Sequence, residues 1–181
     1  MKQSMWVDVM VEEYDSIVQN NVWDVVLRPE DKLVVSSRSI YKVKQAVDGS
    51  FEKHKARFLA RGFSQLEGID YDEIFSPIAR YPYIISILEL SAQMGLSIHY
   101  MNVKTTFLNG MIEEEVYIEQ LEGFETLDRE SHVCQFKRAL YGLKQAPRAW
   151  YTRIDSYFTR LGFTRSEADA NLYHIVVEGK I

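Results

Sequence analysis

The sequence predicts an α+β fold. Segments with apolar residues at helical spacing and segments typical of β-strands both occur along its 181 residues, without a strict β–α–β alternation. Hydrophobic residues make up 46% of the chain and charged residues 26%, which suits one globular domain with a substantial core. This composition excludes a mainly disordered, collagen-like or disulfide-scaffold protein.

The first third of the chain predicts one helix followed by strands. Apolar residues recur at helical spacing over residues 5–19, which predicts an amphipathic helix. Residues 22–27 are rich in strand formers and indicate a short strand. Residues 37–45 and 51–63 are predicted to be two strands, and the dipeptide Asp48–Gly49 between them is a strong hairpin signal.

The rest of the chain predicts two helices among short strands and loops. After a loop at residues 68–77, one helix is expected to begin near Pro82 and to end at Gly95. The clearest helix begins at Pro147 and ends before Gly162, with large apolar side chains on one face. The other expected elements are strands at 97–103, 115–119, 133–137 and 172–177, a polar turn at 109–110 and an acidic loop at 121–131.

Cysteine content and hydropathy bear on the compartment. The single Cys134 cannot form an internal disulfide, which fits a reducing compartment. No apolar run approaches the ~20 residues of a membrane-spanning helix, so no membrane partner is expected. Residues 1–6 lack the apolar stretch of a signal peptide, and the chain is therefore expected to be intracellular and not secreted.

Charge is strongly segregated along the chain, whose formal net charge is −5. Residues 38–61 carry a net charge of +5, so the remainder carries −10, and residues 111–130 hold eight carboxylates against one arginine. Because residues two apart on a strand share a face, the cations of each predicted hairpin strand point together: Lys42 and Lys44 on the first, and Lys53, Lys55, Arg57 and Arg61 on the second. Such a ribbon can follow a sugar–phosphate backbone or neutralise a triphosphate. The alternative is a solvated hairpin face, but the shortage of compensating acids favours a phosphate site.

Two further segments could belong to a site, although each also has an ordinary structural explanation. In residues 140–151, Gly142 lets the backbone approach a ligand, and Lys144 and Arg148 can meet phosphates at the start of a helix. Residues 99–110 form a predicted strand that ends in a polar turn. The chain contains no GxGxxG, P-loop or GxSxG motif, and its four histidines are too scattered for a zinc site.

Several sequence blocks follow one another over nearly the whole chain. They are EEYDSIVQNNVWDVV (residues 12–26), YKVK (41–44), KARFLARGFSQLEGIDYDEIFSPIAR (55–80), VKTTFLNG (103–110), EEEVYIEQLEGF (113–124) and VCQFKRALYGLKQAPRAWY (133–151). In this order they resemble the reverse transcriptase domain of copia-type LTR retrotransposons. So many ordered blocks are far more specific than any single motif in the chain.

The resemblance implies a right-hand polymerase fold. Residues from about 1 to 96 would be fingers-like, and residues from about 97 to 181 would be the N-terminal part of the palm. The implied activity is RNA-directed DNA synthesis from an RNA or DNA primer–template and deoxynucleoside triphosphates. The implied cofactor is a pair of Mg²⁺ ions held by aspartates, which activate the primer 3′-hydroxyl and stabilise the leaving pyrophosphate.

The resemblance also assigns roles to residues of this chain. Asn102 falls where the family motif DVKTAFLNG has its metal-binding aspartate. Phe107 falls at the aromatic residue that lies beside the sugar 2′-position. The remaining implied positions are near the incoming triphosphate (Lys42, Lys55 and Arg57) and against the nucleotide and template (Tyr141, Gly142 and Gln145).

Two departures from the family pattern concern the metal ions. Asn102 offers a neutral amide with one oxygen and N–H donors, whereas Mg²⁺ requires hard anionic oxygens. The Tyr-x-Asp-Asp hairpin, which would bring the other metal-binding aspartates, does not occur before Ile181. We therefore expect a truncated, degenerate copy with no metal ligands, no productive Mg²⁺ binding and no polymerase activity. Two alternatives stay open: a non-catalytic nucleic-acid-binding remnant, or a fragment of a longer, active protein.

Overall fold

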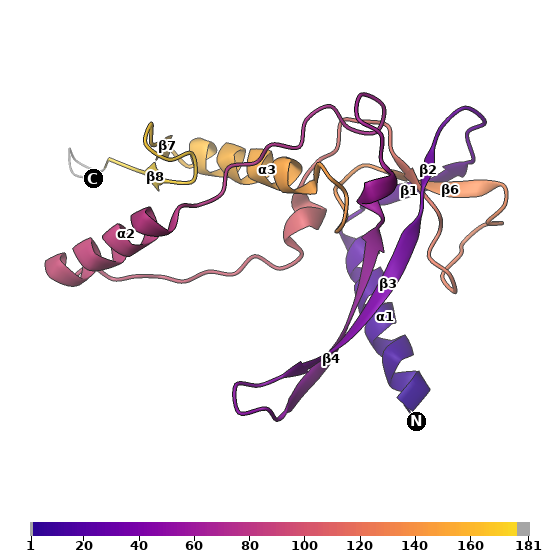
Figure 1. The fold of residues 1–181 in the computed structure, drawn as a ribbon, viewed down its shortest axis with the longest axis horizontal. Helices are drawn as coiled ribbons and strands as arrows, with labels where there is room; N and C mark the ends of the chain where they lie inside the picture. Colours follow the sequence, from indigo (N-terminus) through magenta and orange to yellow (C-terminus); the bar gives the residue numbers. More distant parts are fainter. Residues whose placement is uncertain (1, 177–181) are drawn as a thin grey trace.

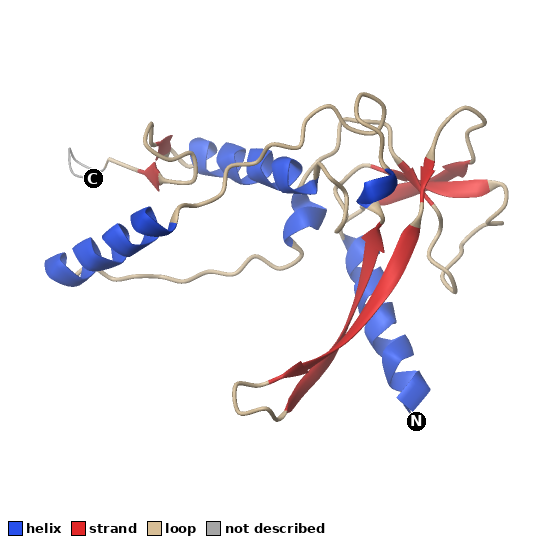
Figure 2. Ribbon diagram, viewed as in Figure 1, coloured by secondary structure: helices blue, strands red, loops and turns tan. Residues whose placement is uncertain are grey.

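The computed structural model describes residues 2–176 of the chain (Figure 1). Its helices and short 3₁₀ turns are α1 (Lys2–Gln19), η1 (Gly62–Ser64), α2 (Tyr81–Met94), η2 (Thr106–Asn109) and α3 (Ala146–Arg160). Its strands are β1 (Trp23–Leu27), β2 (Val34–Val35), β3 (Ser37–Gln45), β4 (Phe51–Ala60), β5 (Tyr117–Ile118), β6 (His132–Phe136), β7 (Thr164–Arg165) and β8 (Tyr173–His174). Separate helices and mostly antiparallel strands confirm the predicted α+β class (Figure 2).

The main sheet has four strands in the order β1-β6-β5-β2. The central strand β6 pairs antiparallel with β1, where Val25 lies opposite Cys134, and antiparallel with β5. β5 in turn pairs parallel with β2. Two of these strands precede residue 96 and two follow it, so the two predicted parts of the chain share one hydrogen-bonded sheet. Their assignment as fingers-like and palm-like stays a prediction.

The β3–β4 hairpin forms where the sequence predicts it. The carboxylate of Asp48 accepts a hydrogen bond from the Ser50 N–H at 2.9 Å, and Gly49 adopts a φ of 82° in the turn. The predicted end of the second strand at residue 63 is wrong, because β4 ends at Ala60 and the η1 turn follows. Arg61 therefore lies beyond β4 and is not part of the face that the lysines share.

Helix α1 connects the hairpin to the main sheet. Its side chains Met10 and Ile17 are buried in one core with Phe58 of β4. Nearer the hairpin tip, the Trp6 ring packs edge-on against His54 with centroids 4.5 Å apart. The rest of the core comes from the sheet strands and the loops around them and includes Val35, Val116, Ile118, Cys134, Phe136, Leu140 and Leu143.

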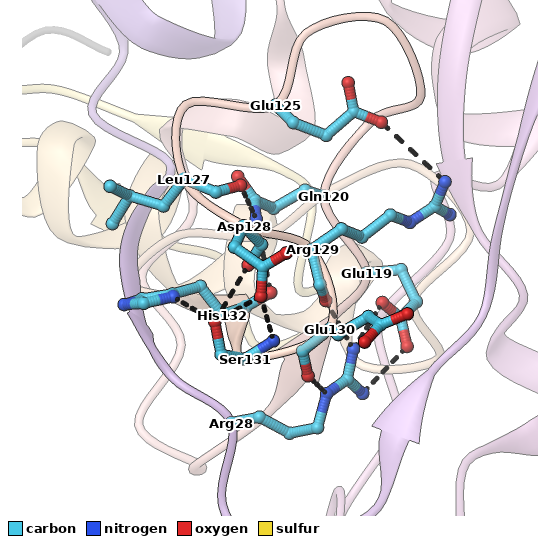
Figure 3. A network of polar contacts seen from close by, with 10 residues as sticks. All are labelled: Arg28, Glu119, Gln120, Glu125, Leu127, Asp128, Arg129, Glu130, Ser131 and His132. Atoms are coloured by element: carbon cyan, nitrogen blue, oxygen red, sulfur yellow. Dashed lines mark hydrogen bonds and ion pairs between the residues drawn. The ribbon is translucent and has the colours of Figure 1, made fainter.

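The predicted acidic loop is ordered by Arg28, as Figure 3 shows. The Arg28 guanidinium donates to both carboxylate oxygens of Glu119 at 2.9 Å, and its Nε donates to the Glu130 carbonyl at 2.9 Å. Beside it, the buried amide of Gln120 donates to the His132 carbonyl at 3.2 Å. A bidentate arginine thus neutralises part of the most acidic segment and fixes the return of the chain into β6.

Helix α3 begins with Pro147 in its first turn, as predicted. The short β7–β8 pair folds back on this helix, where Asp155 accepts a 2.7 Å hydrogen bond from the Tyr173 hydroxyl. The Tyr173 ring also packs on Phe158 with centroids 5.0 Å apart. The predicted last strand at 172–177 is present as β8, and its final residue lies outside the described residues.

Helix α2 ends where predicted, at Gly95 with a φ of 65°. It projects from the main sheet and contributes little to the core (Figure 1). Ser91 is its only buried residue, whereas Ile84, Ile85 and Leu88 are nearly half exposed. The helix therefore presents an apolar surface that no other part of residues 2–176 covers.

The predicted strand at residues 97–103 is wrong. This segment runs as an exposed, extended chain between α2 and η2 (Figure 1). Alternating apolar residues such as Ile98 and Tyr100 suit a strand, but no strand among residues 2–176 pairs with them. Without a partner the backbone groups bond to solvent, so the strand pattern alone does not produce a strand. The predicted turn at 109–110 is present as the end of η2, where the Gly110 N–H donates to the Phe107 carbonyl at 2.9 Å.

The structure of residues 2–176 bears on two expectations from the sequence, one about membrane-spanning helices and one about Cys134. None of the helices in this part of the chain combines the length and the apolar character needed to cross a membrane. Cys134 is a free, buried thiol in β6, and burial raises its pKa to about 12. The thiol is therefore protonated at neutral pH and does not act as a nucleophile.

Candidate functional site

The β3–β4 hairpin carries lysines in directly opposed pairs. Lys42 lies opposite Lys55 and Lys44 lies opposite Lys53, so the four side chains share one face. Arg57 follows Lys55 by two residues on the same strand and continues this face. We call Lys42, Lys44, Lys53, Lys55 and Arg57 the cationic face. Like charges that lie opposite each other repel, so an anion placed over this face would be stabilised.

Positive charge is most crowded around Lys55. Partial burial lowers the pKa of its amine, and the neighbouring charges of Arg57 and Lys44 lower the pKa further. The carboxylate of Glu13 raises this pKa but does not compensate the other effects. A bound anion would relieve this crowding, because an opposite charge favours the protonated amine.

Arg57 connects the cationic face to the rest of the molecule. Its Nη1 lies 2.5 Å from Oε2 of Glu13 on α1, and its guanidinium carbon lies 4.9 Å from the centroid of the Tyr141 ring. Burial raises the pKa of the Tyr141 hydroxyl, an effect that the Arg57 charge opposes. Tyr141 is therefore a neutral phenol at physiological pH and a flat support for the guanidinium.

Phe107 extends this arrangement by a second aromatic ring. It belongs to η2, and its ring centroid lies 5.4 Å from that of Tyr141 at an interplanar angle of 69°. Thr105, which precedes η2, has a φ of 52°, an uncommon value for a β-branched residue that turns the chain into η2. The fold thus brings three predicted site residues together from three separate segments. We call Arg57, Tyr141 and Phe107 the Arg57–Phe107 row.

Gly142 lets the loop of residues 140–143 contact the end of β4. Its φ is 92°, and a Cβ at this position would stand 2.1 Å from the carbonyl oxygen of Ala60. The Ala60 N–H also donates to the Tyr141 carbonyl at 2.9 Å. The close backbone approach expected at Gly142 therefore occurs, and in this structure the neighbouring backbone is that of β4.

Gln145 lies inside a buried polar network. Its Nε2 donates to the Asp70 carbonyl at 2.9 Å, and its Oε1 accepts from Nε2 of Gln65 at 3.1 Å. The Gln65 Oε1 in turn accepts from the backbone N–H of Lys144 at 2.8 Å. Both polar atoms of the Gln145 amide bond to the chain itself, so this residue holds the segment 65–70 against the start of α3. Its contact with a template stays a prediction.

Asn102 is not drawn into these contacts. It is exposed on the unpaired segment between α2 and η2, and it offers a neutral amide where Mg²⁺ prefers carboxylate oxygens. Within residues 2–176, no three His, Cys, Asp or Glu side chains gather closely enough to hold a metal ion. The amide of Asn102 therefore does not fit the metal-ligand position that the resemblance implies.

Glu13 and Gln65 are not among the site residues predicted from the sequence. Both are buried polar residues that hold predicted site residues in place. For Glu13 a signal exists, because it falls three residues after Met10 and four before Ile17 on the buried side of an amphipathic helix. A carboxylate among apolar helix positions indicates a partner elsewhere in the chain. For Gln65, in an irregular segment, the sequence carries no such signal.

A groove of about 550 Å³ opens beside α3. Half of its lining consists of charged side chains of both signs, Asp72, Glu113, Glu114, Arg148 and Arg153, and the predicted site residue Gln145 is among the uncharged lining residues. It includes neither the cationic face nor the Arg57–Phe107 row. The mixed lining selects no single class of ligand, so the cationic face and the row remain the candidate site.

Comparison with known proteins identifies the relatives of this chain. A family model described as reverse transcriptase (RNA-dependent DNA polymerase) matches residues 20–181. The chain is 40% identical over 91% of its length to the retrovirus-related Pol polyprotein from transposon TNT 1-94 of Nicotiana tabacum. It is 36% identical over 99% of its length to the corresponding polyprotein from transposon RE1 of Arabidopsis thaliana.

The chain spans about 12% of the length of these two relatives. No solved structure is significantly similar to it. The family match covers most of the chain, and the ordered sequence blocks lie largely within it. The chain therefore belongs to the reverse transcriptase (RNA-dependent DNA polymerase) family, in its copia-type retrotransposon branch.

Proposed function

We propose that this chain supplies the fingers and the first part of the palm of a copia-type reverse transcriptase domain. In this proposal Lys42, Lys55 and Arg57 contact the triphosphate of an incoming nucleotide, and Phe107 lies beside its sugar. Tyr141 and Gly142, with the buried Gln145 beneath them, form the layer behind the nucleotide and template. The domain would use an RNA or DNA primer–template for RNA-directed DNA synthesis.

The observation that carries this proposal is the position of the Arg57–Phe107 row at the base of the cationic face. The guanidinium of Arg57 can bind phosphate oxygens through two parallel hydrogen bonds, and the aromatic rings beside it offer flat apolar surface. The lysines continue the positive charge along the hairpin. This combination suits a nucleotide better than it suits a simple anion.

We further propose that these 181 residues do not join nucleotides as they stand. Asn102 provides no negative charge at the position where the family places a metal-binding aspartate. The loss of one carboxylate from a two-metal site is expected to cost several kcal/mol of transition-state stabilisation, and each ~1.4 kcal/mol lowers the rate tenfold.

Primer extension tests the role of Asn102. Residues 1–181 would be followed by a segment that carries a Tyr-x-Asp-Asp motif, and this chimera would be assayed with Mg²⁺ with and without Asn102→Asp. We expect activity only after the substitution, since Mg²⁺ then has an anionic ligand. Gln93→Glu, an exposed position on α2, adds the same charge elsewhere and serves as the control. Equal inactivity with and without Asn102→Asp would contradict the proposal.

A second candidate function is non-catalytic binding of nucleic acid, which the cationic face favours. Neutralising phosphates releases counterions, so the affinity for a primer–template should fall steeply as salt rises. Lys42→Ala and Lys53→Ala should each reduce the slope of log K against log[salt] by roughly one. Lys32→Ala is the control, because Lys32 lies outside the hairpin and its amine pairs with the Glu115 carboxylate at a distance of 2.9 Å. No mobility shift at low salt would exclude this function.

A further inference from the structure

Helix α1 places one carboxylate where its neighbours on the same helix are apolar. Glu13 is 5% exposed, and it lies between Met10 and Ile17, which belong to the core. The residues that match the reverse transcriptase family model begin only at residue 20, so Glu13 lies outside them. A buried carboxylate is costly unless it is paired and hydrogen-bonded, so its partners explain why the fold contains it.

The two oxygens of Glu13 bond to two different parts of β4. Oε2 accepts from Nη1 of Arg57 at 2.5 Å, and Oε1 accepts from the backbone N–H of Phe58 at 3.3 Å. Phe58 is 1% exposed and is among the largest buried side chains of the core. The backbone N–H of the buried Phe58 thus holds the Glu13 carboxylate at a rigid point of the fold. The carboxylate in turn holds the guanidinium of Arg57.

Stability alone does not account for this pair. Burial raises the pKa of the Glu13 carboxyl, and the opposing effects of Arg57, the Phe58 N–H and Lys55 do not reverse that rise. The ionised carboxylate is therefore less favourable in the folded chain than in water. A buried ion pair of this kind gives little net stability, and its value lies in the geometry that it imposes.

The geometry leaves one edge of the Arg57 guanidinium available. Nη1 is bonded to Glu13 and lies 3.4 Å from the Ala56 carbonyl oxygen. The Tyr141 side chain, whose ring centroid lies 4.9 Å from the guanidinium carbon, is a further hydrogen-bond partner of Arg57. No other group among the described residues accepts a hydrogen bond from Nε or Nη2, and the side chain is 30% exposed. Nε–H and Nη2–H form a parallel pair of donors that matches two oxygens of a phosphate group.

We propose that Glu13 is the positioning residue that fixes Arg57, so that the Nε–Nη2 edge is presented to a phosphate group of a nucleotide bound on the cationic face. This inference rests on the proposed function, because it assumes that the cationic face takes a phosphate ligand. Glu13 itself does not contact the ligand. It acts by restricting the Arg57 side chain before the ligand binds, so that less conformational entropy is lost on binding.

Whether the substitution Glu13→Gln weakens or strengthens the binding of an anion tests the proposal. Glu13→Gln keeps the shape of the side chain and removes one negative charge, so a purely electrostatic role predicts tighter binding of an anion. A positioning role predicts the opposite, a roughly five-fold weaker affinity, because one donor of a charge-assisted pair is no longer held in place. The probes are inorganic tripolyphosphate and, separately, a primer–template duplex, each titrated into the full chain at fixed salt. Weaker binding of tripolyphosphate identifies a triphosphate site, and weaker binding of the duplex alone identifies a backbone phosphate site.

Two variants make the test specific. Glu12→Gln removes the same charge from the adjacent, exposed position of α1 and should not weaken binding. Arg57→Gln should weaken binding, and in that background Glu13→Gln should have no further effect, since it acts through Arg57. Unchanged or tighter binding by Glu13→Gln would overturn the positioning role while leaving the proposed function intact. If the unsubstituted chain binds neither probe at low salt, both the function and this inference are wrong.

A measurement on the unsubstituted chain keeps the test independent of how the variants fold. Nuclear magnetic resonance of the arginine Nε–H groups reports rotation about the Nε–Cζ bond. We expect this rotation to be slower for Arg57 than for Arg38, which is exposed on β3, because Glu13 and Tyr141 hold the Arg57 guanidinium. The Arg57 signal is assigned by its loss in Arg57→Lys. Equally fast rotation of both groups would overturn the proposal.

Discussion

Gly62 and Gly142 lie so close together that a Cβ on Gly62 would stand 2.1 Å from the carbonyl oxygen of Gly142. Gly142 is equally close to β4, since its own Cβ would stand 2.1 Å from the Ala60 carbonyl oxygen. The end of the hairpin and the loop before α3 therefore meet backbone to backbone. This contact places Tyr141 beside Arg57 and so assembles the candidate site.

Gly142→Ala should separate these two segments. The added methyl group would meet backbone that cannot move without breaking the Ala60–Tyr141 hydrogen bond, so we expect a loss of about 3 kcal/mol or more in the free energy of unfolding. Gly123→Ala is the matched control, because Gly123 has a φ of 84° but no atom within 4 Å of the place that its added methyl group would take. It should cost about 1–2 kcal/mol, from backbone strain alone. Equal losses in urea unfolding would contradict the steric explanation.

Gln145→Ala should destabilise the chain through its unpaired neighbours. The substitution leaves the Asp70 carbonyl and the Gln65 amide without their buried partner, at an expected cost of about 1–3 kcal/mol. Gln93→Ala, on the exposed surface of α2, should change the free energy of unfolding by less than about 0.5 kcal/mol. Thermal or urea unfolding of the two variants measures both values. A Gln145→Ala variant as stable as Gln93→Ala would show that the network is not important for folding.

Glu13 should make stability depend on pH in a definite direction. Its pKa is raised in the folded chain, mainly by burial, so the folded state binds the Glu13 proton more tightly than the unfolded state does. This contribution to stability is fully present below the unfolded pKa of about 4.5 and is lost as pH rises through the folded pKa. We therefore expect the free energy of unfolding of the unsubstituted chain, relative to Glu13→Gln, to fall as pH rises from 4.5.

Urea unfolding at several pH values measures this trend. Glu12→Gln is the control, because it removes a carboxyl group from the exposed side of the same helix. The Glu13 carboxyl faces Arg57 and Lys55 of β4, and both favour its ionised form, so a reversed trend would mean that pairing outweighs burial. An identical trend in both variants would show that Glu13 is not the group responsible.

The apolar surface of α2 should limit the solubility of these 181 residues. Ile84, Ile85 and Leu88 are nearly half exposed, and the helix contributes only Ser91 to the buried residues. Large exposed apolar patches favour association. Leu88→Lys should raise the solubility several-fold without lowering Tm, since Leu88 makes few buried contacts.

Sedimentation after concentration measures the effect of this substitution. Gln93→Lys adds the same charge at a polar position of α2 and should raise the solubility less. A Leu88→Lys variant that still aggregates like the unsubstituted chain would show that another surface is responsible. A lower Tm for Leu88→Lys would show that the helix packs in solution.

Short-range chemistry explains which elements could be predicted. Asp48 and Gly49 form the hairpin turn within five residues, and Gly95 ends α2 with a left-handed backbone. These signals act between neighbours in the chain, so they depend little on the rest of the fold. The prediction at 97–103 failed for the complementary reason, because a strand requires a second strand and residues 2–176 provide none there.

The sequence by itself determined the α+β class, the hairpin with its concentrated positive charge, and the reverse transcriptase family. Each of these follows from local patterns or from the order of blocks along the chain. Only the tertiary structure decided that Glu13 holds Arg57 across 44 residues, and that Gly142 rests on Ala60. Such contacts form when packing brings distant segments within bonding distance, and no pattern of neighbouring residues encodes that distance.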